Sequence, residues 1–308
     1  MNNISRTFQF ESEVDKHIID CMEIKPSDKI KGIVQIVHGM CEHKERYIEF
    51  MNYLADKGLL CIIHDHRGHG KSVSDNSEFG YFDKGGWQAL FRDTRQLTGI
   101  MKKRYPNVPY FLIGHSMGSL VARGFLKRFD YEIDKLILLG SPSKMPGMKI
   151  GKLLTRILIL IKGEKSRSHL ADKLIVDLRY EAKFKGEGDH AWICSDPSVI
   201  DVYKKDPLCN FRFTLQGYEQ LIKLTIDIYS KKNWDVTKPD IPILFLSGED
   251  DPCALSPEKF KEAQNLLKSI GYNNVEGRMI KGMRHEILNE PGRKKVYDMI
   301  YKFIMHDI

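Results

Sequence analysis

The sequence predicts an α/β fold with a mostly parallel central sheet, helices on both faces and a helical cap insertion. Short apolar runs alternate with helix-like periodic segments up to about residue 140 and again after residue 232. This alternation is typical of parallel strands connected by covering helices. Residues 141–232 show helical and irregular patterns without a convincing buried strand. We therefore expect residues 1–140 and 233–308 to form the core and residues 141–232 to form the cap.

The elements of the core follow from local patterns along the chain. Extended segments near residues 8–10 and 17–22 predict an N-terminal hairpin, and apolar, often β-branched runs predict buried strands at 33–37, 60–63, 110–113, 136–139, 243–246 and 275–280. Apolar residues at helical spacing predict helices at 47–57, 87–104, 120–129, 258–269 and 292–304.

Composition excludes several classes of protein. The chain has 308 residues, of which 42% are hydrophobic and 29% charged, which is ordinary for a globular protein. The formal charge of +7 is concentrated between residues 141 and 170, where one acidic residue accompanies seven basic ones: Lys144, Lys149, Lys152, Arg156, Lys162, Lys165 and Arg167. No nucleic-acid-binding motif accompanies this cluster. It favours an anionic interface or substrate over nucleic acid.

Neither a secretory signal nor a membrane span is expected. The N-terminal residues lack an apolar segment, and the longest purely aliphatic run covers only residues 157–161. Six cysteines are scattered without C-x-x-C pairs, which indicates free thiols in a reducing compartment. These observations predict a cytoplasmic protein.

The most informative segment is Gly114-His115-Ser116-Met117-Gly118, which lies between a predicted strand and a predicted helix. A G-x-S-x-G sequence in that context places the serine on a sharp, strained turn with its hydroxyl exposed above the sheet. Side chains at 114 and 118 would collide where the strand and helix approach each other. Ser116 is therefore the candidate nucleophile, with Gly114 and Gly118 in support.

A serine nucleophile needs a base and an orienting carboxylate, and after such a turn the chain order is serine, acid, histidine. The candidate base is His285, because it is the downstream histidine that follows a predicted strand of the core. Glu249, Asp250 and Asp251 follow the predicted strand at 243–246. The residues alone leave open which of these carboxylates faces the imidazole.

An oxyanion hole requires two N–H donors. We expect one from Met117, which follows the nucleophile, and one from Met40, in the loop after an early strand beside Gly39. Both are backbone donors, so the adjacent glycines should matter more than the methionine side chains.

Two other chemistries are suggested by one loop. His64-Asp65-His66-Arg67-Gly68-His69 resembles a binuclear metal site, but Gly68 replaces the aspartate that such a site requires. Gly68-x-Gly70 hints at dinucleotide binding, but Val73 occupies the position of the third glycine. We expect a structural loop in which Arg67 and His66 bond to its own backbone, and neither a metal nor an organic cofactor.

Five segments together resemble the α/β-hydrolase superfamily and, within it, the monoglyceride lipase and lysophospholipase group of the serine aminopeptidase type. They are His38-Gly39-Met40-x-Glu42-His43-x-x-Arg46-Tyr47, Asp65-x-x-Gly68-His69-Gly70-x-Ser72, the Ser116 pentapeptide, Gly248-x-x-Asp251 and Gly282-x-x-His285-x-x-x-x-Glu290. The resemblance favours Asp251 over Asp250 as the acid. Residues 141–232 contain no matching motif, so the resemblance defines the chemistry better than the substrate.

The resemblance implies a serine carboxylic-ester hydrolase that acts on a monoacylglycerol, a lysophospholipid or a similar single-chain ester. A prolyl-aminopeptidase-type peptidase is the alternative on the same fold, and a catalytically silent binding protein is a more distant one. The cap itself carries an apolar stripe at helical spacing, Ile150, Leu153, Leu154, Ile157, Leu158 and Ile161, interspersed with basic residues. Such a stripe predicts either peripheral contact with a membrane or packing of the cap onto the core.

Overall fold

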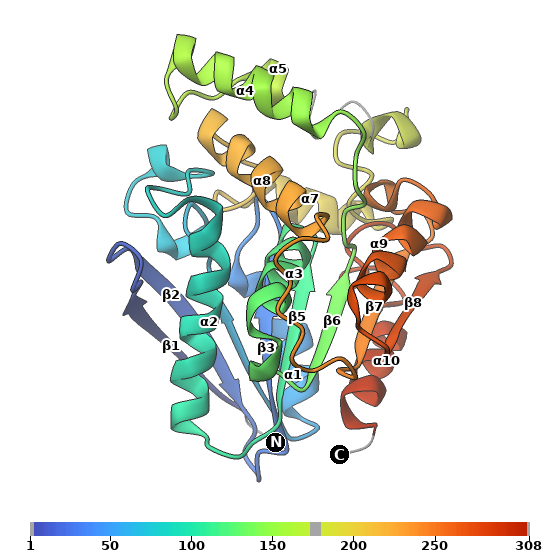
Figure 1. The fold of residues 1–308 in the computed structure, drawn as a ribbon. Coiled ribbons are helices and arrows are strands. Elements are labelled where there is room, and N and C mark those ends of the chain that lie inside the picture. Colours follow the sequence, from blue (N-terminus) through green and yellow to red (C-terminus); the bar gives the residue numbers. More distant parts are fainter. Residues whose placement is uncertain (1–2, 173–179, 307–308) are drawn as a thin grey trace.

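A sheet of eight strands forms the centre of the protein, and helices cover both of its faces (Figure 1). The structure is a computed structural model that describes residues 3–172 and 180–306. The strands run in the order β1-β2-β4-β3-β5-β6-β7-β8, with β1 and β2 antiparallel to their neighbours and the others parallel. Their bounds are Ile4–Glu11, Ile18–Lys25, Gly32–Val37, Leu59–His64, Tyr110–His115, Lys135–Leu139, Ile243–Gly248 and Val275–Ile280 for β1 to β8. The predicted hairpin and mostly parallel sheet are thus confirmed.

The five helices predicted with bounds, which correspond to α1, α2, α3, α9 and α10, are confirmed to within a few residues. The α-helices of the described residues are α1 Ile48–Ala55, α2 Gly86–Arg104, α3 Met117–Phe129, α4 Met148–Lys162, α5 His169–Asp172, α7 Pro197–Lys205, α8 Leu215–Ile228, α9 Pro257–Ile270 and α10 Arg293–Met305. Short 3₁₀ helices lie at Lys44–Tyr47, Gly70–Ser72, Asn76–Glu78, Asp130–Glu132, Glu181–Phe184 and Pro252–Ala254. Helix α3 begins three residues before the predicted 120–129 segment, because the turn at Ser116 leads directly into it.

Two apolar cores lie on opposite faces of the sheet. Along β5, Tyr110 and Leu112 pack into the core that includes α2 and α3, whereas Phe111 and Ile113 pack into the core that includes α1 and α10. This alternation follows from the two-residue period of a strand. Burying each such side chain contributes about 1.5–3 kcal/mol, so the middle of the sheet is a rigid support for loops at its edge.

The segment between β6 and β7 supplies α4, α5, α7 and α8, and its described residues contain no strand. Helix α8 packs against α2 and α3, and α4 packs on α8 as an outer layer, at the top of Figure 1. The division into a core and a cap at residues 141 and 232 stays a prediction. The polypeptide in this segment nevertheless covers the end of the sheet at which β5 passes into α3 (Figure 1).

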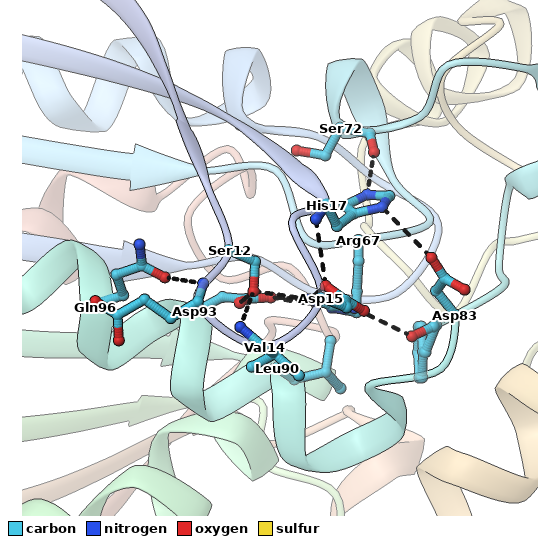
Figure 2. A network of polar contacts seen from close by, with 12 residues as sticks. Ser12, Val14, Asp15, His17, Arg67, Ser72, Asp83, Leu90, Asp93 and Gln96 are labelled. Atoms are coloured by element: carbon cyan, nitrogen blue, oxygen red, sulfur yellow. Dashed lines mark hydrogen bonds and ion pairs between the residues drawn. The ribbon is translucent and has the colours of Figure 1, made fainter.

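The expectation for Arg67 is wrong in its partners. Its buried guanidinium forms ion pairs with Asp93 on α2 (2.8 Å) and with Asp15 in the β1–β2 turn (2.7 Å), and Figure 2 shows both carboxylates beside it. His66 likewise bonds outside its loop, to the main chain and ring of His38. Arg67 thus ties this loop to the N-terminal hairpin and α2.

Candidate active site

Ser116 occupies a strained turn between β5 and α3. Its φ of 52° and ψ of −120° lie in a region that residues other than glycine rarely adopt. A Cβ at Gly114 would lie 2.4 Å from the Gly118 carbonyl oxygen, and one at Gly118 would lie 2.0 Å from that of Val37. The predicted collision of side chains at 114 and 118 is therefore real, and these glycines allow α3 to start against the sheet.

The structure brings Ser116, His285 and Asp251 into one hydrogen-bonded line. His285 Nε2 lies 2.8 Å from Ser116 Oγ, and His285 Nδ1 lies 3.0 Å from each carboxylate oxygen of Asp251. The three residues come from the loops after β5, β7 and β8, at the carboxyl ends of parallel strands. This arrangement has the geometry of a nucleophile, a base and an orienting acid.

The structure separates the two candidate acids. Asp251 is buried and also accepts hydrogen bonds from Ser247 Oγ (3.0 Å) and the Cys253 amide (2.8 Å). The Asp250 side chain is 49% exposed and lies 3.3 Å from Lys183 Nζ. Asp251 is therefore the carboxylate that faces the imidazole, and Asp250 points elsewhere.

Burial and charge act in opposite directions on the pair. Burial alone would lower the pKa of His285, but the Asp251 carboxylate outweighs it and raises that pKa above its ordinary value. Burial likewise opposes ionisation of Asp251, and His285 together with the hydrogen bonds lowers the pKa of the carboxyl. An ionised Asp251 thus holds the Nδ1–H tautomer, which leaves Nε2 free to accept the proton of Ser116.

The loop that carries Gly39 and Met40 lies against the nucleophile. A Cβ at Gly39 would lie 3.1 Å from Ser116 Cβ and 2.6 Å from Glu42 Oε1, so no larger residue fits without a shift. Met40 and Met117 both line the cavity that contains Ser116. The structure therefore brings together all of the residues that the sequence placed at the site.

A buried polar network that the sequence did not assign lies beneath this loop. Glu42 Oε1 accepts hydrogen bonds from the Gly39 amide (2.5 Å) and Tyr47 Oη (2.9 Å), and it lies 3.1 Å from His115 Nδ1. Burial opposes ionisation of Glu42, but His115 and Arg46 hold the pKa of the carboxyl below its usual range. Glu42 belongs to the first of the five motifs, so the sequence marked this residue but did not reveal its contacts with Gly39, Tyr47 and His115.

Glu286 and Glu290 continue this support around His285. Arg46 donates two hydrogen bonds to Glu286, at 2.6 and 2.7 Å, which ties the segment after Gly39 and Met40 to the residue after His285. Glu290 accepts from the amides of Arg284 (2.8 Å) and Ser195 (3.0 Å), so it connects the histidine loop to the segment between β6 and β7.

A cavity of about 710 Å³ opens above Ser116. Much of its lining is apolar and comes from the segment between β6 and β7, including Met148, Leu154, Leu158, Leu221 and Ile222. The Trp192 ring lies 5.1 Å from the His285 ring and 5.0 Å from that of Tyr180. No local pattern marks these aromatic residues, because only the fold brings them to the site. A site of this size and polarity suits a ligand with a large apolar part.

All six cysteines lie among the described residues, where they are buried and form no disulfide. Within residues 3–172 and 180–306, potential metal donors gather in two groups, His43–Asp206–Cys209 and Asp251–Cys253–His285. The predicted loop histidines, His64, His66 and His69, belong to neither group. In the same ranges, no helix combines the length and apolar character needed to cross a membrane.

Known proteins resemble the chain in sequence and in structure. It is 26% identical to a monoacylglycerol lipase of Mycolicibacterium smegmatis, over 91% of this chain and 90% of the relative, and 28% identical to a monoglyceride lipase of Homo sapiens, over 77% and 71%. A thermostable carboxyl esterase from Bacillus coagulans, solved in complex with glycerol, superposes with a TM-score of 0.88 at 27% identity and covers 97% of both chains.

Sheet order, the turn at Ser116 and the three loops at one edge of the sheet define an α/β hydrolase. The model of the family described as serine aminopeptidase, S33, matches residues 28–292, and the chain belongs to this family. Within it, the comparisons support a carboxylic-ester hydrolase.

Proposed function

We propose that the protein is a serine carboxylic-ester hydrolase that cleaves single-chain lipid esters, with monoacylglycerol as the leading substrate and lysophospholipid as the next. The observation that carries the proposal is the contact of 2.8 Å between His285 Nε2 and Ser116 Oγ at the base of a largely apolar cavity. The lipase relatives and the glycerol-bound esterase support the choice of a glycerol ester.

The reaction proceeds through an acyl-enzyme. Ser116 Oγ attacks the ester carbonyl while His285 Nε2 takes its proton, and the amides of Met40 and Met117 donate to the oxyanion. The tetrahedral intermediate collapses as His285 returns the proton to the departing alcohol oxygen. Water then repeats the sequence on the acyl-enzyme, releases the fatty acid and regenerates Ser116. Asp251 keeps the imidazole in its required tautomer throughout.

Peptidase activity of the prolyl-aminopeptidase type is the second candidate. Three carboxylates from the segment between β6 and β7, Asp172, Glu181 and Asp189, line the cavity and are the kind of group that holds a substrate amine. Asp172, however, is paired with Arg212 at 2.8 Å. The relatives named above also favour an ester over an amide.

Hydrolysis assays on wild type and Ser116→Ala distinguish the lipid-ester hydrolase from the peptidase. The substrates are p-nitrophenyl esters from acetate to palmitate, monooleoylglycerol, oleoyl lysophosphatidylcholine and prolyl p-nitroanilide. We expect activity that rises with acyl length, is highest on monooleoylglycerol and vanishes in the variant. Activity confined to prolyl p-nitroanilide would replace the proposal by the peptidase, and activity on none of them would overturn both.

Helix α4 adds a proposed contact with an anionic lipid surface. Most of its apolar stripe faces outward: Ile150 is 66% exposed, Leu153 60% and Ile161 72%. Leu160, which lies beside the stripe, is 81% exposed. Lys149, Arg156 and Lys162 are exposed beside them. Because these side chains are exposed, they do not pack the cap onto the core. The exposed part of the stripe therefore favours membrane contact over packing.

Vesicle pelleting tests this contact. We expect anionic vesicles to retain more protein than neutral ones, because basic side chains near such a surface each contribute about 1 kcal/mol. Leu160→Asp should reduce retention, whereas Val202→Asp, on α7 and also exposed (67%, against 81% for Leu160), should not. Equal retention by anionic and neutral vesicles would contradict the proposed contact.

A further inference from the structure

Four buried histidines lie beneath the loop that carries Met40, and the reaction described above uses none of them. His38, His64, His66 and His69 are at most 1% exposed. The His38 ring lies 4.5 Å from that of His66 and 5.3 Å from that of His69, and the rings of His64 and His66 lie 5.0 Å apart. Of these four histidines, only His38 is adjacent in sequence to Gly39, whose carbonyl shares a peptide group with the Met40 amide.

Hydrogen bonds define the tautomer of His38. The His66 amide donates to His38 Nε2 at 2.9 Å, so this nitrogen carries no proton. The remaining nitrogen, Nδ1, lies 2.8 Å from the Gly39 carbonyl oxygen and therefore donates its hydrogen to it. His66 Nε2 in turn lies 3.2 Å from the His38 carbonyl oxygen.

His38 also stays neutral. Burial, together with His66 and His69, lowers its pKa well below the ordinary value, so no second proton competes for Nε2 at neutral pH. The hydrogen bond to Gly39 is consequently a fixed feature of the folded protein near neutral pH.

This bond controls a group that the reaction needs. The Gly39 carbonyl and the Met40 N–H belong to one planar trans peptide and point in opposite directions. Holding the oxygen against His38 therefore fixes the direction of the Met40 N–H. On the other side of the same residue, the Gly39 N–H is held by Glu42 Oε1 at 2.5 Å.

We propose that His38 is a positioning residue for ester hydrolysis, and that its Nδ1–H aims the Met40 amide at the developing oxyanion. This inference rests on the proposed function. An oxyanion donor contributes to the rate only when it is directed at the oxyanion before the reaction starts, because reorientation would consume the stabilisation. The imidazole supplies that orientation without touching the substrate.

The test compares His38→Leu with His38→Asn. Both variants lose Nε2, which accepts the hydrogen bond from the His66 amide. Only asparagine retains an N–H donor near the position of Nδ1. His64→Phe is the matched control, since it alters the same cluster without a contact to Gly39. All variants are checked for folding by near-ultraviolet circular dichroism. If His38→Leu does not fold, His38→Ala takes its place.

The readouts are kcat and KM on a soluble p-nitrophenyl ester and the affinity of a trifluoromethyl ketone that forms the oxyanion adduct. We expect His38→Leu to lower kcat by about 10²- to 10³-fold, as removal of one oxyanion donor does. Its KM should stay within about threefold, and ketone affinity should fall in parallel with kcat/KM. His38→Asn should recover at least about tenfold of the lost kcat, and His64→Phe should keep the wild-type kcat.

Wild-type kcat in His38→Leu would overturn the inference, and so would equal losses in all three variants or unchanged ketone affinity. These outcomes differ from a failure of the proposed function, in which wild type itself does not hydrolyse the ester.

Discussion

The strained backbone of Ser116 makes a prediction about stability that is independent of any substrate. Its φ and ψ (52° and −120°) cost about 1–3 kcal/mol for a residue with a Cβ, and glycine adopts them without that cost. Ser116→Ala and Ser116→Gly both lose the hydroxyl and its bond to His285, so they differ only in the Cβ. The methyl contact that glycine gives up is worth less than about 0.8 kcal/mol.

Glycine also increases the conformational entropy of the unfolded chain, which lowers the free energy of unfolding by about 0.4–1 kcal/mol relative to alanine. A control pair of variants measures this contribution separately. Ser27 is exposed in a bend with an ordinary φ, and Ser27→Gly should be less stable than Ser27→Ala by that amount. After this correction, the free energy of unfolding of Ser116→Gly should exceed that of Ser116→Ala by between about 0.2 and 3 kcal/mol. An unfolding entropy of about 2.1 cal/mol/K per residue converts this to about 0.3–4.6 °C in Tm.

Calorimetric unfolding of the four variants measures this difference. If Ser116→Gly were no more stable than Ser116→Ala after the Ser27 correction, Ser116 would not store the strain that we assign to the turn.

Three further predictions follow from particular contacts. Asp251→Asn should lower kcat by about 10⁴-fold and move the acidic limb of the kcat/KM profile to lower pH, because Asp251 raises the pKa of His285; an unmoved limb would contradict this coupling. Burial lowers the pKa of His64 to about 3, so the stability held by its neutral form is complete above the unfolded pKa near 6.5 and is lost as the pH falls below it. Between pH 7 and pH 5, the free energy of unfolding of His64→Phe relative to wild type should therefore rise by about 2 kcal/mol in urea titrations. A difference that does not change with pH would refute the lowered pKa of His64. Gly118→Ala should destabilise the fold by at least about 3 kcal/mol, since its methyl group would meet the Val37 carbonyl oxygen at 2.0 Å, whereas Gly99→Ala on α2, with open space around it, should not destabilise it.

The sequence predicts the parts of the site that depend on local geometry. A serine between two glycines, after a strand and before a helix, has few conformations available, and acid and base loops after parallel strands meet at one edge of the sheet. The residues alone did not separate Asp250 from Asp251, because adjacent carboxylates differ only in direction. The resemblance favoured Asp251, and the fold gives the physical reason. Asp251 turns inward to Ser247 and the Cys253 amide, and Asp250 turns outward to Lys183.

Contacts between distant segments escaped prediction for a different reason. The partners of Arg67, Asp15 and Asp93, lie 52 and 26 residues away, and no periodic pattern links such positions. Trp192 reaches His285 across the chain in the same way. The spacing of apolar residues predicted the helix at α4, but not that Leu160 and Ile161 would face outward, because an amphipathic pattern does not say what covers the apolar face.

The central claim is that Ser116 is an activated nucleophile. The most direct measurement is reaction of the folded protein with a fluorophosphonate, followed by peptide mass spectrometry to locate the phosphonyl group. We predict one adduct, on Ser116, that is absent from Ser116→Ala and forms far more slowly in His285→Ala. An adduct on another serine, such as the nearby Ser143, or no adduct on the folded chain, would contradict the account.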